Sequence, residues 1–259
     1  MNNFIPEIPM IRCDFSLIGS AKYMYQIEET MQWRNTGQTG DWTISTGNVM
    51  CNDTSLVTDI ILNLLPKFQW GWINQYQKAY GAEPVLDLKI RCKESCFPFV
   101  ILDRKIIRFL RDTQTRLRLF ALEDGSTSNC QAMRLKLVLK GDAMPFELVE
   151  KMTGKNAVFK RRKEEFPEAV QNQTEDCWVY ETNKFYTDNL QEIAGSLYSA
   201  FSGNINNFIN SERSLIEINV YKNNEAEGIS LETIIPEALI LLAEELGAPL
   251  FIGNYLVEK

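Results

Sequence analysis

The sequence contains no histidine among its 259 residues. This absence excludes Ser-His-Asp and Cys-His catalysis, histidine-containing zinc sites and switching by histidine protonation. An enzyme built from this chain would have to use carboxylates, lysine, tyrosine or cysteine instead. The missing residue lowers the expectation of hydrolase chemistry, and we expect a protein that is not an enzyme.

Long apolar runs are also absent. The longest, 238–243, is far shorter than the roughly 20 apolar residues that a helix needs to span a bilayer. The first ten residues lack the basic region and apolar core of a signal peptide. We therefore expect a cytoplasmic protein that does not bind membranes.

The six cysteines show no metal-binding spacing. Cys92 and Cys96 form a close pair, but no second pair follows at the distance of a zinc site. A chain of this length without a signal peptide more often keeps its thiols reduced than forms disulfides. Phosphate-binding glycine loops and metal-binding carboxylate loops are missing as well. We expect no cofactor and no metal.

The net charge of -7 is spread unevenly. Residues 1–123 carry 14 Lys/Arg and 13 Asp/Glu, a net of +1, whereas residues 124–259 carry 13 and 21, a net of -8. An acidic second half argues against general nucleic-acid binding, which needs basic surface. It would steer a basic partner toward the protein, although acidic surfaces also simply keep proteins soluble.

The polar run 123–129 separates two segments that predict the same order of elements. Each segment predicts strand, helix, strand, helix, strand, helix, strand from its alternating and helical apolar patterns. The predicted strands are 11–18, 41–46, 85–92 and 116–122 in the first segment, and 133–139, 177–182, 215–221 and 249–255 in the second. Trp42 and Trp178 stand at the start of equivalent strands, where we expect core packing.

We therefore predict an α+β fold made of two homologous copies, 1–123 with an N-terminal arm and 132–259. Each copy is expected to form a mostly antiparallel or mixed four-stranded sheet with about three helices. The linker is short and polar, and apolar strands would leave exposed sheet edges if each copy stood alone. We expect the copies to pack as a pseudo-two-fold pair, in a protein that is a monomer or a weak dimer.

Four features of the second segment carry a resemblance: Gly141-Asp142 before a short helix that ends at Gly154, Trp178 after a basic loop, the helix from Leu190, and Gly228–Leu231 before the Leu246-Gly247-Ala248 stop. Over about residues 132–256 the chain resembles a bacterial family known as domain of unknown function 4279. Residues 10–122 share the skeleton but lack the Leu-Gly stop and a counterpart of Tyr255. The resemblance implies a tandem duplication with an α+β fold, and it brings no catalytic residues.

Two groups of residues are candidates for binding. Trp70 and Trp72 have no equivalents in the second segment and form either a binding patch or the packing between the copies. The acid-rich positions could contact a partner or simply be solvated surface: Glu175, Asp176, Glu225 and Glu227.

The basic run 160–163 invites a phosphate-binding interpretation, but three glutamates follow closely, so we expect a solvated, mobile loop.

Two functional hypotheses remain open. The first is a non-enzymatic protein-binding domain pair, most concretely a bacterial immunity protein, or antitoxin, that neutralises a cognate toxin by direct contact; a basic toxin domain is the candidate partner. The alternative is an enzyme or small-ligand-binding protein that uses carboxylates such as Asp41, Glu175 or Asp176 in a cleft between the copies.

Overall fold

A computed structural model describes residues 8–31, 40–93, 98–123, 132–165, 175–203, 213–221 and 230–255. The fold is α+β, as the sequence predicts, and its described residues form seven α-helices and two mixed sheets. The chain divides into two compact units, and neither is continuous in sequence. The first comprises 1–100, 108–129 and 224–235, and the second comprises 101–107, 130–223 and 236–259. The expected halves, 1–123 and 132–259, thus supply most of each unit but not all of it.

The first half of the chain supplies these elements: β1 (Met10–Ile18), η1 (Ala21–Tyr23), α1 (Met24–Met31), β2 (Trp42–Ser45), β3 (Val49–Met50), α2 (Thr54–Leu64), η2 (Lys67–Gln69), α3 (Trp70–Tyr80), β4 (Glu83–Cys92), β5 (Val100–Leu102), α4 (Arg104–Asp112) and β6 (Arg116–Glu123). Local signals set several of these bounds. Asp53 caps α2 by accepting a hydrogen bond from Ser55 N at 2.9 Å, and Asp103 accepts from the first amides of α4. Gly81 ends α3 in the left-handed conformation that glycine adopts without strain.

The second half supplies β7 (Ala132–Gly141), α5 (Phe146–Thr153), β8 (Phe159–Arg161), η3 (Lys163–Glu165), β9 (Asp176–Glu181), β10 (Phe185–Tyr186), η4 (Thr187–Asn189), α7 (Leu190–Phe201), β11 (Leu215–Tyr221), β12 (Ser230–Ile235), α8 (Glu237–Leu246) and β13 (Leu250–Tyr255). Gly154 and Gly247 end α5 and α8 in the left-handed conformation, at the stops that the sequence predicts.

The strands β6-β4-β1-β2 of the first sheet follow the same order along the chain as β13-β11-β7-β9 of the second. The first runs β12-β6-β4-β1-β2, with β3 also paired to β1, and the second runs β5-β13-β11-β7-β9-β8, with β10 also paired to β7. In each sheet two central strands are parallel, β4 with β6 and β11 with β13. The pairs β1–β4, β6–β12 and β7–β11 are antiparallel. Each sheet is larger than the four strands expected. The short strands β3, β5, β8 and β10 are added, and Ser230–Ile235, where the sequence predicted the start of a helix, forms strand β12.

Edge strand β12 comes from the second half of the sequence yet belongs to the first sheet. It pairs with β6 in antiparallel register from Ser230 opposite Leu122 to Ile235 opposite Leu117. Leu231 and Ile235 are each only 3% exposed. The first sheet therefore needs Ser230–Ile235 as its edge strand.

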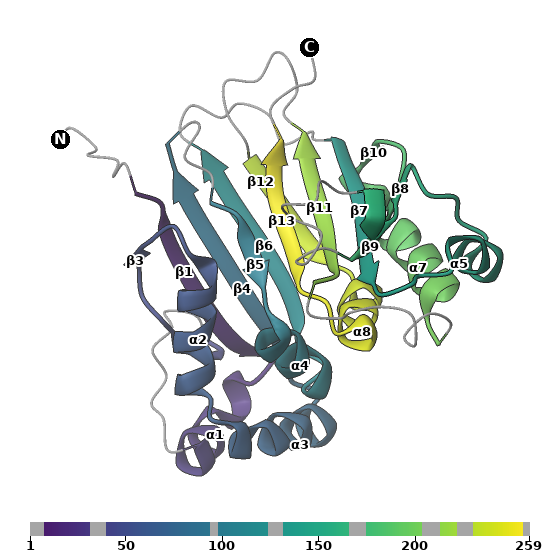
Figure 1. Ribbon diagram of the computed structural model, residues 1–259. Helices are drawn as coiled ribbons and strands as arrows, with labels where there is room; N and C mark the ends of the chain where they lie inside the picture. The colour runs from purple at the N-terminus through teal and green to yellow at the C-terminus, as the bar shows by residue number, and fades with distance from the viewer. Residues whose placement is uncertain are drawn as a thin grey trace. The chain divides into compact units, whose positions relative to one another are not determined.

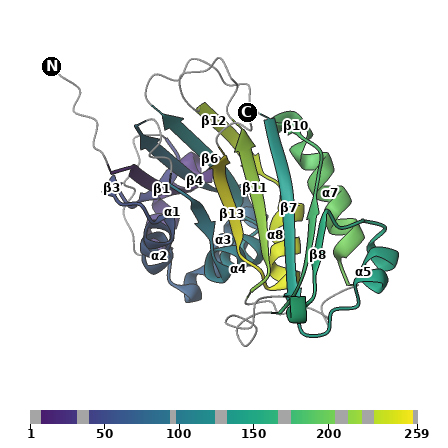
Figure 2. The same cartoon turned by 45° about the horizontal axis from the view of Figure 1, so that its top comes forward.

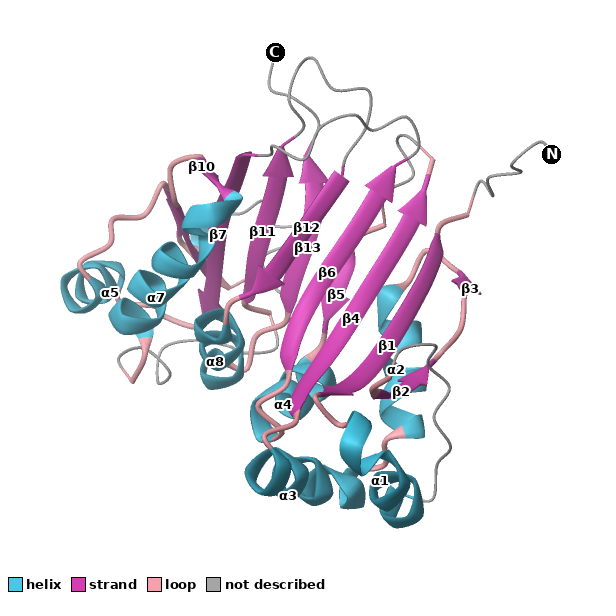
Figure 3. Cartoon of the chain, turned by 180° about the vertical axis from the view of Figure 1, so that it is seen from behind, coloured by secondary structure: helices cyan, strands magenta, loops and turns pink. Residues whose placement is uncertain are grey.

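The core of the first unit lies on the helix-covered face of its sheet. Ile11, Cys13, Phe15 and Leu17 of β1 point to that face and are fully buried. Trp42 and Phe109 meet Phe15 edge-on, with ring centroids 6.3 and 5.7 Å away. Helix α2 crosses this face in Figure 1, whereas Figure 3 shows the opposite face, with β1, β4 and β6 in view and α2 behind them.

The core of the second unit follows the same plan. Helices α7 and α8 lie together on one side of its sheet (Figures 1 and 2). Trp178 is fully buried and meets Phe201 of α7 edge-on at 5.8 Å. The expected core role of Trp42 and Trp178 is therefore confirmed.

Candidate binding face of the first sheet

The face of the first sheet opposite α2 carries a grid of charged side chains, and we call it the open face. It is defined by the even-numbered residues of β1, β6 and β12 and the odd-numbered residues of β4, because side chains alternate along a strand. Strand register places these residues in rows. One row is Arg12, Lys89, Phe120 and Glu232; the next is Asp14, Asp87 and Arg118, with Ile234 at its end.

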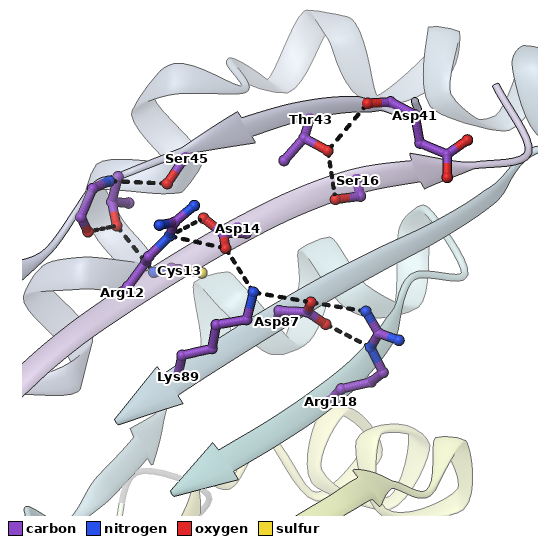
Figure 4. A network of polar contacts seen from close by, with 12 residues as sticks. Arg12, Cys13, Asp14, Ser16, Asp41, Thr43, Ser45, Asp87, Lys89 and Arg118 are labelled. Atoms are coloured by element: carbon purple, nitrogen blue, oxygen red, sulfur yellow. Dashed lines mark hydrogen bonds and ion pairs between the residues drawn. The ribbon is translucent and has the colours of Figure 1, made fainter. Parts of the chain in front are cut away.

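A chain of ion pairs connects three strands across this face (Figure 4). Arg12 Nε donates to both carboxylate oxygens of Asp14, at 2.7 and 3.0 Å. Lys89 Nζ lies 2.9 Å from Asp14 Oδ2 and 3.6 Å from Asp87 Oδ2. Arg118 completes the chain with a bidentate contact to Asp87, at 2.6 and 2.8 Å. Paired contacts of this kind fix the orientation of a guanidinium group.

The two signs of charge lie at different depths in this network. The Asp14 and Asp87 side chains are 4% and 10% exposed, whereas those of Arg12 and Lys89 are 41% and 44% exposed. Burial by itself raises the pKa of Asp14, but hydrogen bonds from Arg12, Ser45 and Lys89 lower it below its ordinary value. The pairing with Asp87 raises the pKa of Arg118. Negative charge therefore lies beneath, and positive charge faces solvent.

A pocket of about 360 Å³ opens on this face. The side chains of Arg12, Lys89 and Arg91 border it together with Glu232, three cations against one carboxylate. Phe120 and Leu122 of β6 supply apolar surface, and Leu122 is 44% exposed. The Arg118 guanidinium lies 5.6 Å from the Phe120 ring centroid, which holds the ring in place by a cation–π contact. The pocket thus combines cationic groups with an apolar floor.

This arrangement is suited to binding more than to acid–base chemistry. A general acid or base needs a carboxyl group that can exchange its proton with substrate. Asp14 and Asp87 are instead held by two or more cationic contacts each. Within the described ranges, no three His, Cys, Asp or Glu side chains are placed to hold a metal ion.

The structure separates the roles of the two tryptophans in α3. Trp70 Nε1 donates to Leu65 O at 3.1 Å, and its ring packs edge-on against Phe109 at 5.2 Å. Trp72 is 40% exposed. Positions two apart on a helix point in nearly opposite directions, so Trp70 supports the first unit and Trp72 faces outward. Both lie on α3, and neither lines the pocket of the open face.

Two acidic candidates, Asp176 and Glu175, lie in the second unit, where Asp176 joins three segments by hydrogen bonds and Glu175 forms an ion pair. Asp176 is 3% exposed and accepts hydrogen bonds from Met144 N, Lys163 N and Arg162 Nη1, all at 2.8–2.9 Å. Burial by itself raises the pKa of Asp176, but these three donors lower it below its ordinary value. Glu175 lies 3.6 Å from Arg213. Glu225 and Glu227 lie outside the described residues.

The basic run 160–163 is partly exposed to solvent, as its composition suggested, but part of it forms a strand and not a loop. Phe159–Arg161 forms β8 and pairs with β9. Arg162 bonds Asp176 and lies 4.0 Å from the Phe146 ring centroid, and Lys163 N also bonds Asp176. The buried carboxylate, 13 residues away in sequence from Lys163, attaches this segment to the second unit. Likewise Asp41 accepts a hydrogen bond from Gly19 N at 2.8 Å, a turn-forming role.

The sequence prediction missed the open face, although its residues carried a signal. Arg12 and Asp14 alternate with buried Ile11, Cys13 and Phe15, and Asp87, Lys89 and Arg91 alternate with apolar residues in β4. Charged residues at several outward positions of two strands indicate a charged sheet face. What could not be read was which charges would be opposite one another.

Comparisons with protein-family models, curated proteins and solved structures gave no match. In the part of the chain that the structure describes, no helix is long and apolar enough to cross a membrane.

Proposed function

We propose that this protein is a non-enzymatic binding protein that recognises another protein through the open face of its first sheet. The observation that supports this is the preorganised charge network, in which buried Asp14 and Asp87 hold exposed cationic side chains in fixed positions. Groups that are already ordered lose less conformational entropy on binding, so they provide specificity at a lower free-energy cost.

The most concrete form of this proposal is a bacterial immunity protein that neutralises a cognate toxin by direct contact. Such a protein needs a stable scaffold and a recognition surface, but no catalytic group. The absence of histidine and the engagement of the carboxylates Asp14, Asp87 and Asp176 agree with that requirement. The open face is therefore expected to serve recognition and not chemistry.

The test measures complex formation with the product of the adjacent gene, together with rescue of cells that express it. Leu122→Asp puts a charge in the pocket of the open face, and we expect it to weaken the complex about tenfold or more, as truncation of a dominant interface residue does. Leu56→Asp is the matched control, because Leu56 is 49% exposed on α2, whereas Leu122 is 44% exposed on the open face. Equal effects of both variants, or no complex at all, contradict the proposal.

A further inference from the structure

The pocket of the open face has a chemistry that the proposed function does not specify. We propose that it binds an acidic side chain of the partner protein, Asp or Glu, that stands next to an apolar residue. The inference rests on the proposed function, since it assigns the feature of the partner that the open face recognises. It differs from the expectation of a basic partner, which rested on the acidity of the second half of the chain.

The depth at which the charges lie favours a negative group at the pocket. Arg12 and Lys89 line it and are 41% and 44% exposed, whereas Asp14, which both of them contact, is 4% exposed. Because Asp14 and Asp87 lie beneath the cationic groups, an approaching anion meets nitrogen atoms first.

The hydrogen-bonding pattern leaves donors directed outward. Among the contacts that the structure describes, Arg12 reaches Asp14 through Nε, while its side chain remains 41% exposed. A guanidinium group has five N–H donors, and Nε supplies only one of them. The Lys89 ammonium has three donors and is 44% exposed. An incoming carboxylate can therefore accept charge-assisted hydrogen bonds without displacing Asp14 or Asp87.

The apolar part of the pocket selects what accompanies the acid. Phe120 and Leu122 are two positions apart on β6, so their side chains point to the same face of the sheet. Met10 of β1 lines the same pocket. The volume of about 360 Å³ lies near the lower limit for small-molecule pockets. Side chains of a protein partner suit a small recess that is open on a sheet surface.

The experiment titrates two capped dipeptides, N-acetyl-Glu-Leu-amide and N-acetyl-Gln-Leu-amide, into the full-length protein. Arginine Nε–Hε and backbone resonances are followed by NMR. The acidic dipeptide is expected to shift the Arg12 and Arg91 signals saturably in the millimolar range, and the amide isostere to bind about threefold to fivefold more weakly or not at all. Equal shifts from both dipeptides, or no saturable shift up to about 10 mM, would overturn the inference.

A matched pair of variants locates the effect. Arg91→Gln removes a cation that lines the pocket. Arg116→Gln removes a cation from the same face but outside the pocket, where Arg116 forms an ion pair with Glu83 at 2.7 Å. Arg91→Gln is expected to weaken the acidic dipeptide about threefold to fivefold, and Arg116→Gln less than about twofold. Equal weakening by both would mean general attraction to a basic face and would refute a defined site.

The two proposals fail in different ways. If Leu122→Asp abolishes the protein complex but the dipeptides show no preference for the acid, the chemical inference is wrong and the proposed function stands. If the acidic dipeptide binds the pocket but Leu122→Asp leaves the complex intact, the pocket chemistry stands and the proposed protein-binding face is wrong.

Discussion

A substitution in the second half of the sequence should destabilise the first unit. Leu231 lies in β12, which pairs with β6 of the first sheet, and its side chain is 3% exposed. Replacing a buried leucine by alanine removes apolar contacts and leaves a cavity, which costs about 2–5 kcal/mol. We expect Leu231→Ala to lower the free energy of unfolding of the first unit by about 2–4 kcal/mol.

The neighbouring position Ile234 provides the control. It lies in the same strand and the same ladder, opposite Arg118, but it is 50% exposed. Ile234→Ala should cost about 1 kcal/mol or less, because it changes strand propensity and little burial. The assay is urea unfolding followed by fluorine NMR of 5-fluorotryptophan, in which Trp42 reports on the first unit and Trp178 on the second.

Cleavage at an inserted protease site near residue 126 tests the role of β12 in a second way. A fragment of residues 1–129 lacks β12, and with it the burial of Leu231 and Ile235, which contributes about 3–6 kcal/mol at roughly 1.5–3 kcal/mol each. That is a large share of the roughly 5–15 kcal/mol by which domains are stable. We expect this fragment to fold poorly alone and the nicked halves to stay together.

Two results would refute this reasoning. The first is an equal effect of Leu231→Ala and Ile234→Ala, or a change confined to the Trp178 signal. The second is separation of the nicked halves without denaturant, each with its own cooperative unfolding transition. Either result would mean that β12 does not complete the first sheet.

Three further predictions concern single sites. The lowered pKa of Asp176 stabilises the fold above the unfolded value of about 3.9, and this stability is lost as pH falls through the folded value. Asp176→Asn should therefore lower the free energy of unfolding by about 1–3 kcal/mol at pH 7, and the variant should lose less stability than the original protein as pH falls. Acid titrations followed by circular dichroism measure this, and an unchanged acid profile would contradict it. Trp70→Ala should lower the free energy of unfolding by about 3 kcal/mol and Trp72→Ala by about 1 kcal/mol or less in urea titrations, since only Trp70 packs against Phe109; equal losses would contradict it. If the second half instead contacts a basic partner, reversing Glu225 and Glu227 to Lys should slow association and flatten its salt dependence in stopped-flow measurements, and on-rates unchanged across salt would refute such steering.

Local patterns in the sequence determined most of the secondary structure. The alternation of Ile11, Cys13, Phe15 and Leu17 specifies a strand with one buried face, and the buried positions follow it. The apolar stripe behind the Asp53 cap specifies α2, which ends just before Pro66. Such signals act between residues a few positions apart, so they can be read without knowing the fold.

The tertiary structure alone decided which strands became neighbours and which charges met. The sequence predicted a helix from Ser230, but Ser230–Ile235 forms a strand, because pairing with β6 overrides the local pattern. Lys89 reaches Asp14 across 75 positions only through the register of β1 and β4. A shift of that register by one residue would turn these side chains to the other face. The open face and its pocket therefore follow from long-range pairing, which local sequence does not encode.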